Sequence, residues 1–260
     1  MTYSPDPSGP PGMTVDQARR SGQGRSFGAA ADIYERGRPS YPREAAEWLI
    51  PSEASVVVDL GAGTGKFTRQ LVAPGRELSA VDPDAAMLEV LRSVLPDVRT
   101  FVGTAESLPF ADHSVDAITV AQAWHWVDLD KGVPEVARVL RPGGTFGLIW
   151  NVRNEDEPWV AALGSIIHQG GSQDLQEQDP VVGAPFEPLE SMTFPWVNVV
   201  TVDEFIDMVA SRSYIIVLPE DEKTRVLNEV RRLLLEESGF DPDRIELPYV
   251  THAYRTHLPS

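Results

Sequence analysis

Short apolar, β-branched runs alternate with amphipathic stretches between Ser55 and Trp150. The first run, SVVVDL, ends in the glycine-rich loop GAGTG, and KFTRQLV after the loop has the spacing of an amphipathic helix. The same succession then recurs along the chain. We expect strands at residues 55–60, 77–82, 98–103, 115–123 and 145–150, with helices at 66–72, 84–95 and 131–140. Strands that alternate with helices predict βαβ units, and therefore a parallel sheet with right-handed crossovers.

The spacing becomes less regular beyond Trp150. We expect a helix around residues 159–167, directly after Pro158, because the first turn of a helix tolerates proline. Farther on we expect a strand at 191–201, helices at 202–211 and 220–237, and a closing strand at 245–257. The last two strands predict an antiparallel pair that ends a mixed sheet.

Proline, glycine and serine are frequent in residues 1–26, which predicts a loose N-terminal arm. We expect residues 27–260 to form a single domain. Its cap elements are expected to come from residues 27–50 and 151–190, where the strand–helix rhythm is absent or weak.

The composition is that of a globular protein with a full core, since 42% of the 260 residues are hydrophobic and 23% are charged. A net charge of −17 argues against nucleic acid as a partner, because a phosphate backbone requires clustered lysine and arginine. The absence of cysteine excludes disulfides and thiolate chemistry. The start of the chain has no signal-peptide pattern, and no apolar run has the length of a membrane span. We therefore expect a cytoplasmic protein; the sequence leaves its oligomeric state open.

The loop from Asp59 to Gly65, DLGAGTG, is the most informative segment. Glycines between a strand and a helix let the backbone and the helix N–H groups approach a ligand closely. A dinucleotide site would need G-x-G-x-x-G, but Lys66 stands where its third glycine belongs, and Lys66-Phe67 does not match a P-loop. Asp59 would repel a pyrophosphate and attract an ammonium group. The loop therefore predicts a ligand without phosphate.

A second acidic residue, Asp82, ends the next strand. A carboxylate there can accept hydrogen bonds from both hydroxyls of a ribose. Capping of the following helix is the alternative role, and Asp84 suits it better. A nucleoside with an ammonium-bearing tail would satisfy both Asp59 and Asp82.

Four segments together resemble the motifs of the class I S-adenosylmethionine-dependent methyltransferases. They are VVVDLGAGTGKFT, AVDPDAAML, GTAESLPFADHSVDAITVAQAWHW and EVARVLRPGGTFGLIW. The resemblance is to the small-molecule branch called type 11, and within it to trans-aconitate-methyltransferase-like proteins, which share an RPxYP segment and an HW pair. It implies a Rossmann-like, seven-stranded mixed sheet in the order 3-2-1-4-5-7-6, with strand 7 antiparallel, helices on both faces and a small cap.

The resemblance also implies a set of residues that bind S-adenosylmethionine. The glycine loop would lie under the methionine and ribose, Asp82 would bind the ribose hydroxyls, and Tyr34 would close over the cofactor. Thr104 stands where the family commonly has an acid that binds the adenine amino group, so this contact would either pass to the backbone of Ala105 or be weaker. The implied cofactor residues are Tyr34, Asp59, Gly61, Ala62, Gly63, Gly65, Asp82, Pro83, Met87, Thr104, Ala105, Glu106 and Gln122.

An acceptor pocket is expected from aromatic residues and one arginine. Trp124, Trp126 and Trp150 at strand ends predict apolar, water-excluding walls, although each taken alone is more often a core residue. Arg38 is a candidate to bind a carboxylate, with a surface ion pair as the equal alternative. His125 lies between two tryptophans, where a neutral imidazole would serve as general base; a packed histidine bonded to backbone is the alternative.

We therefore predict an enzyme that moves the methyl group of S-adenosylmethionine by in-line displacement to an oxygen, carboxylate or hydroxyl, of a small molecule. The alternative is a protein that binds S-adenosylmethionine without methyl transfer, as a cyclase-type catalyst or a sensor. An NAD-dependent oxidoreductase is disfavoured by the glycine spacing. The five histidines form no ligand pattern for a metal, and no G-x-S-x-G hydrolase motif exists.

Overall fold

A computed structural model describes residues 38–167 and 179–260. The part of the chain that it describes contains a seven-stranded sheet in the order β3-β2-β1-β4-β5-β7-β6. The strands are β1 (Val56–Leu60), β2 (Glu77–Asp82), β3 (Arg99–Val102), β4 (Val115–Ala121), β5 (Leu140–Arg153), β6 (Glu190–Val200) and β7 (Ile245–His257). Neighbours from β3 to β5 are parallel, whereas β7 is antiparallel to both β5 and β6. The predicted strand order and the antiparallel final pair are confirmed.

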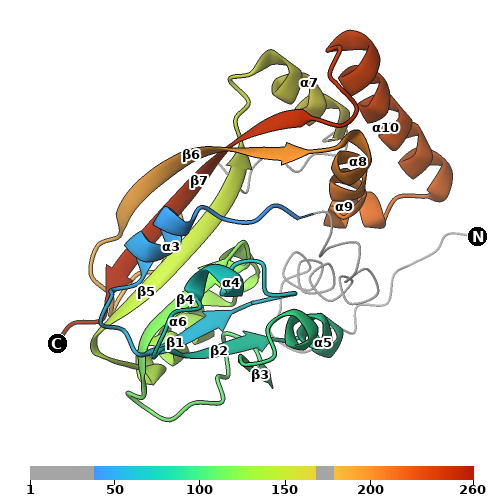
Figure 1. Cartoon of the computed structure of the whole chain (residues 1–260). Helices are drawn as coiled ribbons and strands as arrows, with labels where there is room; N and C mark the ends of the chain where they lie inside the picture. Colours follow the sequence, from blue (N-terminus) through green and yellow to red (C-terminus); the bar gives the residue numbers. More distant parts are fainter. Residues whose placement is uncertain (1–37, 168–178) are drawn as a thin grey trace, which may run out of the picture.

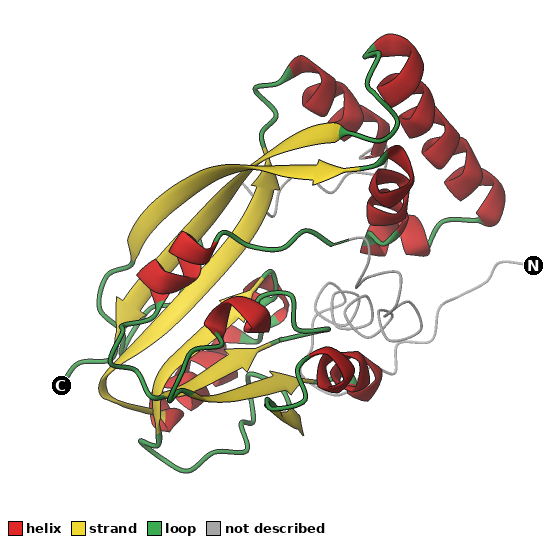
Figure 2. Ribbon diagram, viewed as in Figure 1, coloured by secondary structure: helices red, strands yellow, loops and turns green. Residues whose placement is uncertain are grey.

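Helices cover both faces of the sheet (Figures 1 and 2). The helix α3 packs on one face, where Leu49 contacts Gly147 of β5, and α5 joins the same apolar cluster. The helix α6 belongs to the cluster of the opposite face. The helices of this part are α3 (Arg43–Leu49), α4 (Thr68–Leu71), α5 (Ala85–Val94), the 3-10 turn η2 (Trp124–Trp126) and α6 (Leu129–Val139).

A separate group of helices, here called the helical lobe, lies at one end of the long strands β5, β6 and β7 (Figure 1). It consists of α7 (Pro158–Ile167), α8 (Val202–Ala210), α9 (Ser213–Ile216), α10 (Glu220–Arg232) and the π-helical turn η3 (Leu233–Glu237). The lobe has its own apolar cluster, which includes Phe205, Val230 and Leu234. The sequence placed only α7 of these helices in the cap, because α8 and α10 have the pattern of ordinary amphipathic helices.

Two elements differ in length from the expectation. The helix expected at residues 66–72 is reduced to α4, because the glycine loop continues through Phe67. The strand β5 extends over 14 residues, beginning at Leu140 and passing through Arg-Pro-Gly-Gly. Its pairing with β4 shifts register between Val115 and Ala117, which accommodates the extra residues.

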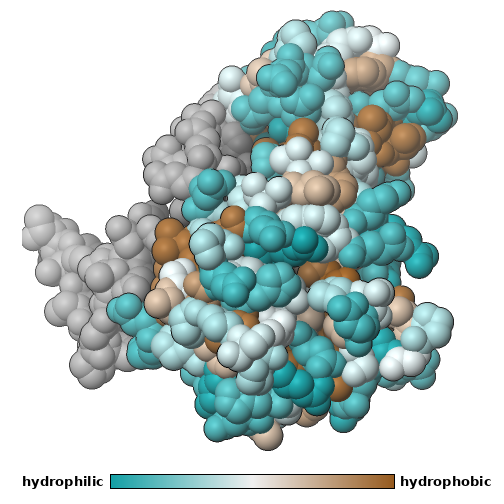
Figure 3. Space-filling view, turned by 90° about the vertical axis from the view of Figure 1, so that its left-hand side faces the viewer, coloured by the Kyte–Doolittle hydropathy of each residue, from teal (hydrophilic) through white to brown (hydrophobic). Residues whose placement is uncertain are grey.

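The face shown in Figure 3 carries mostly hydrophilic residues, and the hydrophobic ones form small separate patches. None of the helices within residues 38–167 and 179–260 is long and apolar enough to cross a membrane. In the same ranges, no three His, Asp or Glu side chains lie close enough to hold a metal ion.

Candidate active site

The glycine loop follows β1 and packs between Ala123, after the end of β4, and Leu91 of the helix α5. Gly61 has φ +70°, and a Cβ added there would lie 2.7 Å from Cβ of Ala123. The N–H groups of Gly61 and Ala62 donate to the carbonyl of Val81, at 2.7 and 3.1 Å. The backbone conformation and the close approach to Ala123 both require glycine at position 61.

Asp82 at the end of β2 holds this loop in place. Its Oδ2 accepts a hydrogen bond from N of Gly63, and its Oδ1 accepts one from N of Asp84, each at 2.8 Å. The side chain is 8% exposed, and burial raises the pKa of Asp82 to about 6. Each carboxylate oxygen can still accept a second hydrogen bond. Asp84 caps α5 through the N–H of Ala86, as the sequence predicted.

Asp59, the other acid of the motif, faces the interior. It is fully buried and accepts hydrogen bonds from Oγ1 of Thr68 at 2.6 Å and from Oγ1 of Thr119 at 3.2 Å. Burial raises the pKa of Asp59 to about 7, against the effect of both threonines and with a contribution from the charge of Asp82. In this structure the carboxylate joins β1, β4 and α4. The predicted contact with an ammonium group stays a prediction.

The residues around the loop fit a nucleoside with a charged tail. Thr64 is fully buried, and its hydroxyl has no hydrogen-bond partner in the part of the chain that the structure describes. A buried hydroxyl of this kind is costly unless a ligand or water satisfies it. Together with the two carboxylate oxygens of Asp82, it supplies polar atoms that hydroxyl and amino groups of a ligand can pair with.

The residues predicted to surround an adenine lie beside the loop. Met87 and Ala105 are buried, whereas Pro83 is exposed. Thr104 forms a β-bridge with Ser107. Oε1 of Glu106 accepts a hydrogen bond of 2.9 Å from N of Asp128, the residue before α6. Glu106 therefore orders the chain between β4 and α6, besides any contact with a ligand.

A cavity of about 320 Å³, counted with its open mouth, adjoins the end of β4. We call it the acceptor cavity. It is lined by residues from segments that lie far apart in the sequence: Arg38, Pro39, Tyr41, Lys66, Gln122, Asn151, Arg212 and Tyr249. Three of these described lining residues are cationic and none is acidic, in a chain of 39 acidic and 22 basic residues.

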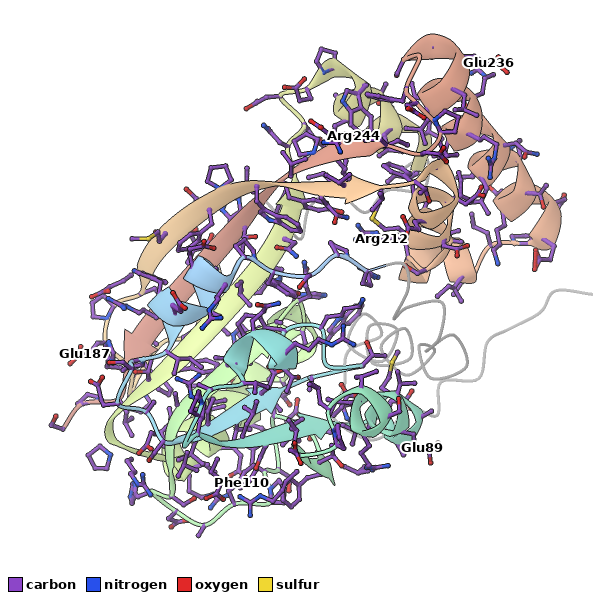
Figure 4. The ribbon with its side chains drawn as sticks, viewed as in Figure 1. Glu89, Phe110, Glu187, Arg212, Glu236 and Arg244 are labelled. Carbon is purple, nitrogen blue, oxygen red and sulfur yellow. The ribbon has the colours of Figure 1, made fainter. Side chains whose placement is uncertain are left out.

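Arg212 comes from the helical lobe and lies at its base, next to α8 (Figure 4). Nη2 of Arg38 donates to the carbonyl of Ser211 at 3.5 Å, so the segment before α3 reaches the same lobe. Gln122 has φ +57°, which turns the chain sharply after β4. Sequence reasoning named Arg38 and Gln122 but missed Asn151 and Tyr249. Only the position of Asn151 near a strand end was a signal for it.

Two of the tryptophans predicted to form walls of the acceptor pocket, Trp124 and Trp150, are not among the described residues that line the acceptor cavity. Trp124 is 3% exposed, and its Nε1 donates to the carbonyl of Val181 at 2.9 Å. Trp150 contacts the ring of Tyr254 and belongs to the same apolar cluster as Trp124. Since successive side chains of a strand point to opposite faces, Trp150 faces away from Asn151 and from the acceptor cavity. Both tryptophans pack the opposite face of the sheet.

His125 and Trp126 lie in η2, directly after β4, and their ring centroids are 4.6 Å apart. Neither lines the acceptor cavity as far as the described residues define it. The assignment of His125 as a base stays a prediction. Tyr34, predicted to close over the cofactor, lies outside the described residues.

Comparison with known proteins agrees with this geometry. A family model described as a methyltransferase domain matches residues 58–148. An uncharacterised methyltransferase of Mycobacterium tuberculosis is 49% identical over 234 residues, which is 90% of this chain and 96% of the relative. A malonyl-[acyl-carrier protein] O-methyltransferase of Methylococcus capsulatus is 42% identical over 154 residues, 52% of this chain and 55% of that protein.

Among solved structures, a putative type II methyltransferase from Anaeromyxobacter dehalogenans superposes with a TM-score of 0.59 and 26% identity, covering 86% of this chain and 99% of the other. The similarity therefore extends beyond the glycine loop to the sheet and the helical lobe. The chain belongs to the class I S-adenosylmethionine-dependent methyltransferases.

Proposed function

We propose that this methyltransferase moves the methyl group to a carboxylate oxygen of a small carboxylic acid. The observation that carries the proposal is the lining of the acceptor cavity, where three cationic residues, Arg38, Lys66 and Arg212, come together. Arginine binds carboxylates through paired hydrogen bonds.

The relative from Methylococcus capsulatus supports an oxygen as the methylated atom, because it is named as an O-methyltransferase of a malonyl group. The similarity covers about half of each chain. It therefore supports the type of chemistry, and the cavity supports the class of acceptor.

We assign the donor site to the glycine loop, Asp82 and Thr64. Bound there, S-adenosylmethionine supplies an electrophilic methyl group on a sulfonium. Asp82 binds the ribose hydroxyls with its two oxygens while it keeps its bonds to Gly63 and Asp84. Asp82→Ala should weaken the binding of S-adenosylhomocysteine by about 1.5–3 kcal/mol, the range for hydrogen bonds to a charged group.

The residues of the acceptor cavity bind and align the acid. Alignment of two reactants in a site from which water is excluded can remove about 7–11 kcal/mol of a barrier. A carboxylate is already ionised at neutral pH, so its methylation needs no general base. In this function His125 has no proton to remove from the acceptor. His125→Gln should then retain most of the turnover, with no new dependence on pH.

The test uses the purified protein with S-adenosylmethionine and a panel of mono-, di- and tricarboxylic acids, each paired with its amide. Mass spectrometry detects the product, and alkaline treatment removes the methyl group only if it is held as an ester. Methylation of amides or alcohols in preference to acids would contradict the proposal. A loss of about 10²–10⁴-fold in His125→Gln, with the wild-type rate falling at acid pH, would instead indicate a hydroxyl acceptor. Binding of S-adenosylhomocysteine by calorimetry, without any methylated product, would favour a role in binding alone.

A further inference from the structure

A chain of hydrogen bonds crosses three strands of the sheet and ends at the acceptor cavity. Nε1 of Trp196 in β6 donates to Oγ1 of Thr251 in β7 at 2.8 Å. Oγ1 of Thr251 donates to Oδ1 of Asn151 in β5 at 2.6 Å. Nδ2 of Asn151 donates to the carbonyl of Ser40, before α3, at 2.8 Å. We call these four residues the relay.

All donors of the relay point in the same direction, from the edge strand toward the cavity. The hydroxyl of Thr251 both accepts and donates, and the carboxamide of Asn151 uses its oxygen on one side and its nitrogen on the other. Thr251 is fully buried and Asn151 is 5% exposed. In such surroundings a broken link leaves a buried polar group without a partner, and satisfied links strengthen each other.

The strand pairing places these residues in register. Asn151 lies directly opposite Thr251 in the β5–β7 ladder, and Trp196 lies opposite Tyr249 in the β6–β7 ladder. Trp196 also stacks on the ring of Tyr249, with centroids 5.2 Å apart and planes at 19°. Tyr249 is itself a wall of the acceptor cavity.

The relay ends on further parts of the cavity wall. The carbonyl of Asn151 accepts a hydrogen bond of 3.1 Å from Nε2 of Gln122, the residue with positive φ that follows β4. Ser40 lies between Pro39 and Tyr41, which both line the cavity, as do Gln122 and Asn151.

We propose that Thr251 and Trp196 are positioning residues for methyl transfer. By fixing the carboxamide of Asn151, they set the place of the segment from Pro39 to Tyr41, although neither Thr251 nor Trp196 lines the cavity. This inference rests on the proposed function for its catalytic consequence. The edge strand β6 thereby influences the reaction across two strands.

The experiment compares Thr251→Val, which keeps the shape and removes the hydroxyl, with Thr251→Ser, which restores the hydroxyl. Thr256→Val is the matched control, because Thr256 is a buried threonine of the same strand whose hydroxyl donates to the carbonyl of Glu187 at 2.6 Å. Trp196→Phe is a milder second variant that keeps an aromatic ring and removes the first donor. The readouts are the turnover of S-adenosylmethionine on the best acid of the panel, the affinity for S-adenosylhomocysteine, and backbone hydrogen exchange.

In Thr251→Val we expect turnover to fall about 10-fold, the loss expected from one broken buried link, with the affinity for S-adenosylhomocysteine changed less than about 2-fold. Hydrogen exchange should become faster in residues 40–45, the segment that the carboxamide of Asn151 holds. Thr251→Ser should restore both readouts, Trp196→Phe should change them less, and Thr256→Val should leave them as in the wild type.

Equal turnover and equal exchange in Thr251→Val and Thr256→Val would overturn the inference. Faster exchange with unchanged turnover would also overturn it, because the relay would then stabilise structure only. Failure of the wild type to methylate any acid would contradict the proposed function instead. Hydrogen exchange needs no methyl acceptor, so it decides in that case whether the relay fixes the segment from Pro39 to Tyr41.

Discussion

The donor side and the acceptor side that we propose for this active site are built in different ways. On the donor side, the glycine loop and the end of β2 form the site largely from backbone, within residues 59–68 and 80–88. On the acceptor side, Arg38, Gln122, Asn151, Arg212 and Tyr249 contribute side chains from five separate segments. A backbone site tolerates few changes of conformation, whereas a side-chain site can change its ligand by single substitutions.

The two sides also differ in charge. The donor side buries two acids, Asp59 and Asp82, whose pKa values are raised by burial to about 7 and about 6. The acceptor side gathers three cations. The difference agrees with a cationic donor and an anionic acceptor, which would meet at the end of β4. The following predictions test whether the two sides respond independently.

The largest effect is expected on the donor side, in Gly61→Ala. The positive φ should cost about 1–2 kcal/mol of unfolding free energy, and contact of the new Cβ with Ala123 should add about 1–3 kcal/mol. Gly75→Ala is the control, since Gly75 has φ +78° and open space around it, so that only the first cost applies. Urea unfolding and titration with S-adenosylhomocysteine measure both variants. Equal losses in the two variants would show that the contact with Ala123 is unimportant.

A second donor-side prediction concerns pH. Between about pH 4 and pH 7 the folded protein keeps a proton on Asp59 that the unfolded chain releases, so this group lowers the free energy of unfolding as pH rises. Asp59→Asn has no such proton. The free energy of unfolding of the variant, relative to that of the wild type, should therefore increase as pH rises through this window, by on the order of 1 kcal/mol per pH unit. Urea unfolding at pH 4.5, 6 and 7.5 measures the difference.

Asp116 provides the control of opposite sign. Partial burial raises the pKa of Asp116, but hydrogen bonds from Val56, Ser55 and Arg141 outweigh this effect and hold the pKa below its usual value. Its stabilising effect is lost only as pH falls below about 4. Asp116→Asn should therefore differ from the wild type by a constant amount between pH 4.5 and 7.5. A parallel pH dependence of the Asp59 and Asp116 variants would refute the assignment for Asp59.

On the acceptor side, Arg212→Met should reduce kcat/KM for a carboxylic acid by about 10- to 150-fold, which corresponds to about 1.5–3 kcal/mol for hydrogen bonds to a charged group. The affinity for S-adenosylhomocysteine should stay unchanged, because Arg212 belongs to the helical lobe. Arg225→Met, on the exposed surface of α10, is the matched control with no expected effect. A loss of donor affinity in Arg212→Met would show that the two sides are not independent.

The smallest effect is expected in Thr201→Ala. Thr201 caps α8 through the N–H of Glu204, and the side chain of Glu204 accepts the N–H of Thr201 in return. Removal of this cap should cost about 1 kcal/mol of stability, measured by urea unfolding. Donor affinity should not change, since the cap supports only the helical lobe. Ser52→Ala, at an exposed turn, provides the comparison with no expected loss.

The strand order that the family resemblance implied is confirmed. The strands β1 and β2 and the glycine loop between them could be predicted because each of their signals is contained in a few consecutive residues. The residues assigned to the donor stay predictions. The acceptor side could not be predicted in this way. Asn151 and Tyr249 come together only after the strands β5 and β7 have paired, and the residues next to them in the chain do not indicate this pairing. Trp124 and Trp150 show the same limit, since a tryptophan near a strand end can point to either face of the sheet. Their contact with the acceptor stays a prediction.

The alternation along β5 limits how this protein can change its length. Asn151 faces the acceptor cavity and Trp150 packs the opposite face. Insertion or deletion of one residue in the preceding stretch would exchange the two, placing an indole in the relay and a carboxamide in the core. Evolution can therefore vary the acceptor by substitution and by rebuilding the loops around the helical lobe. A change of one residue in the length of the strand between Gly144 and Asn151 would disrupt both the core and the relay.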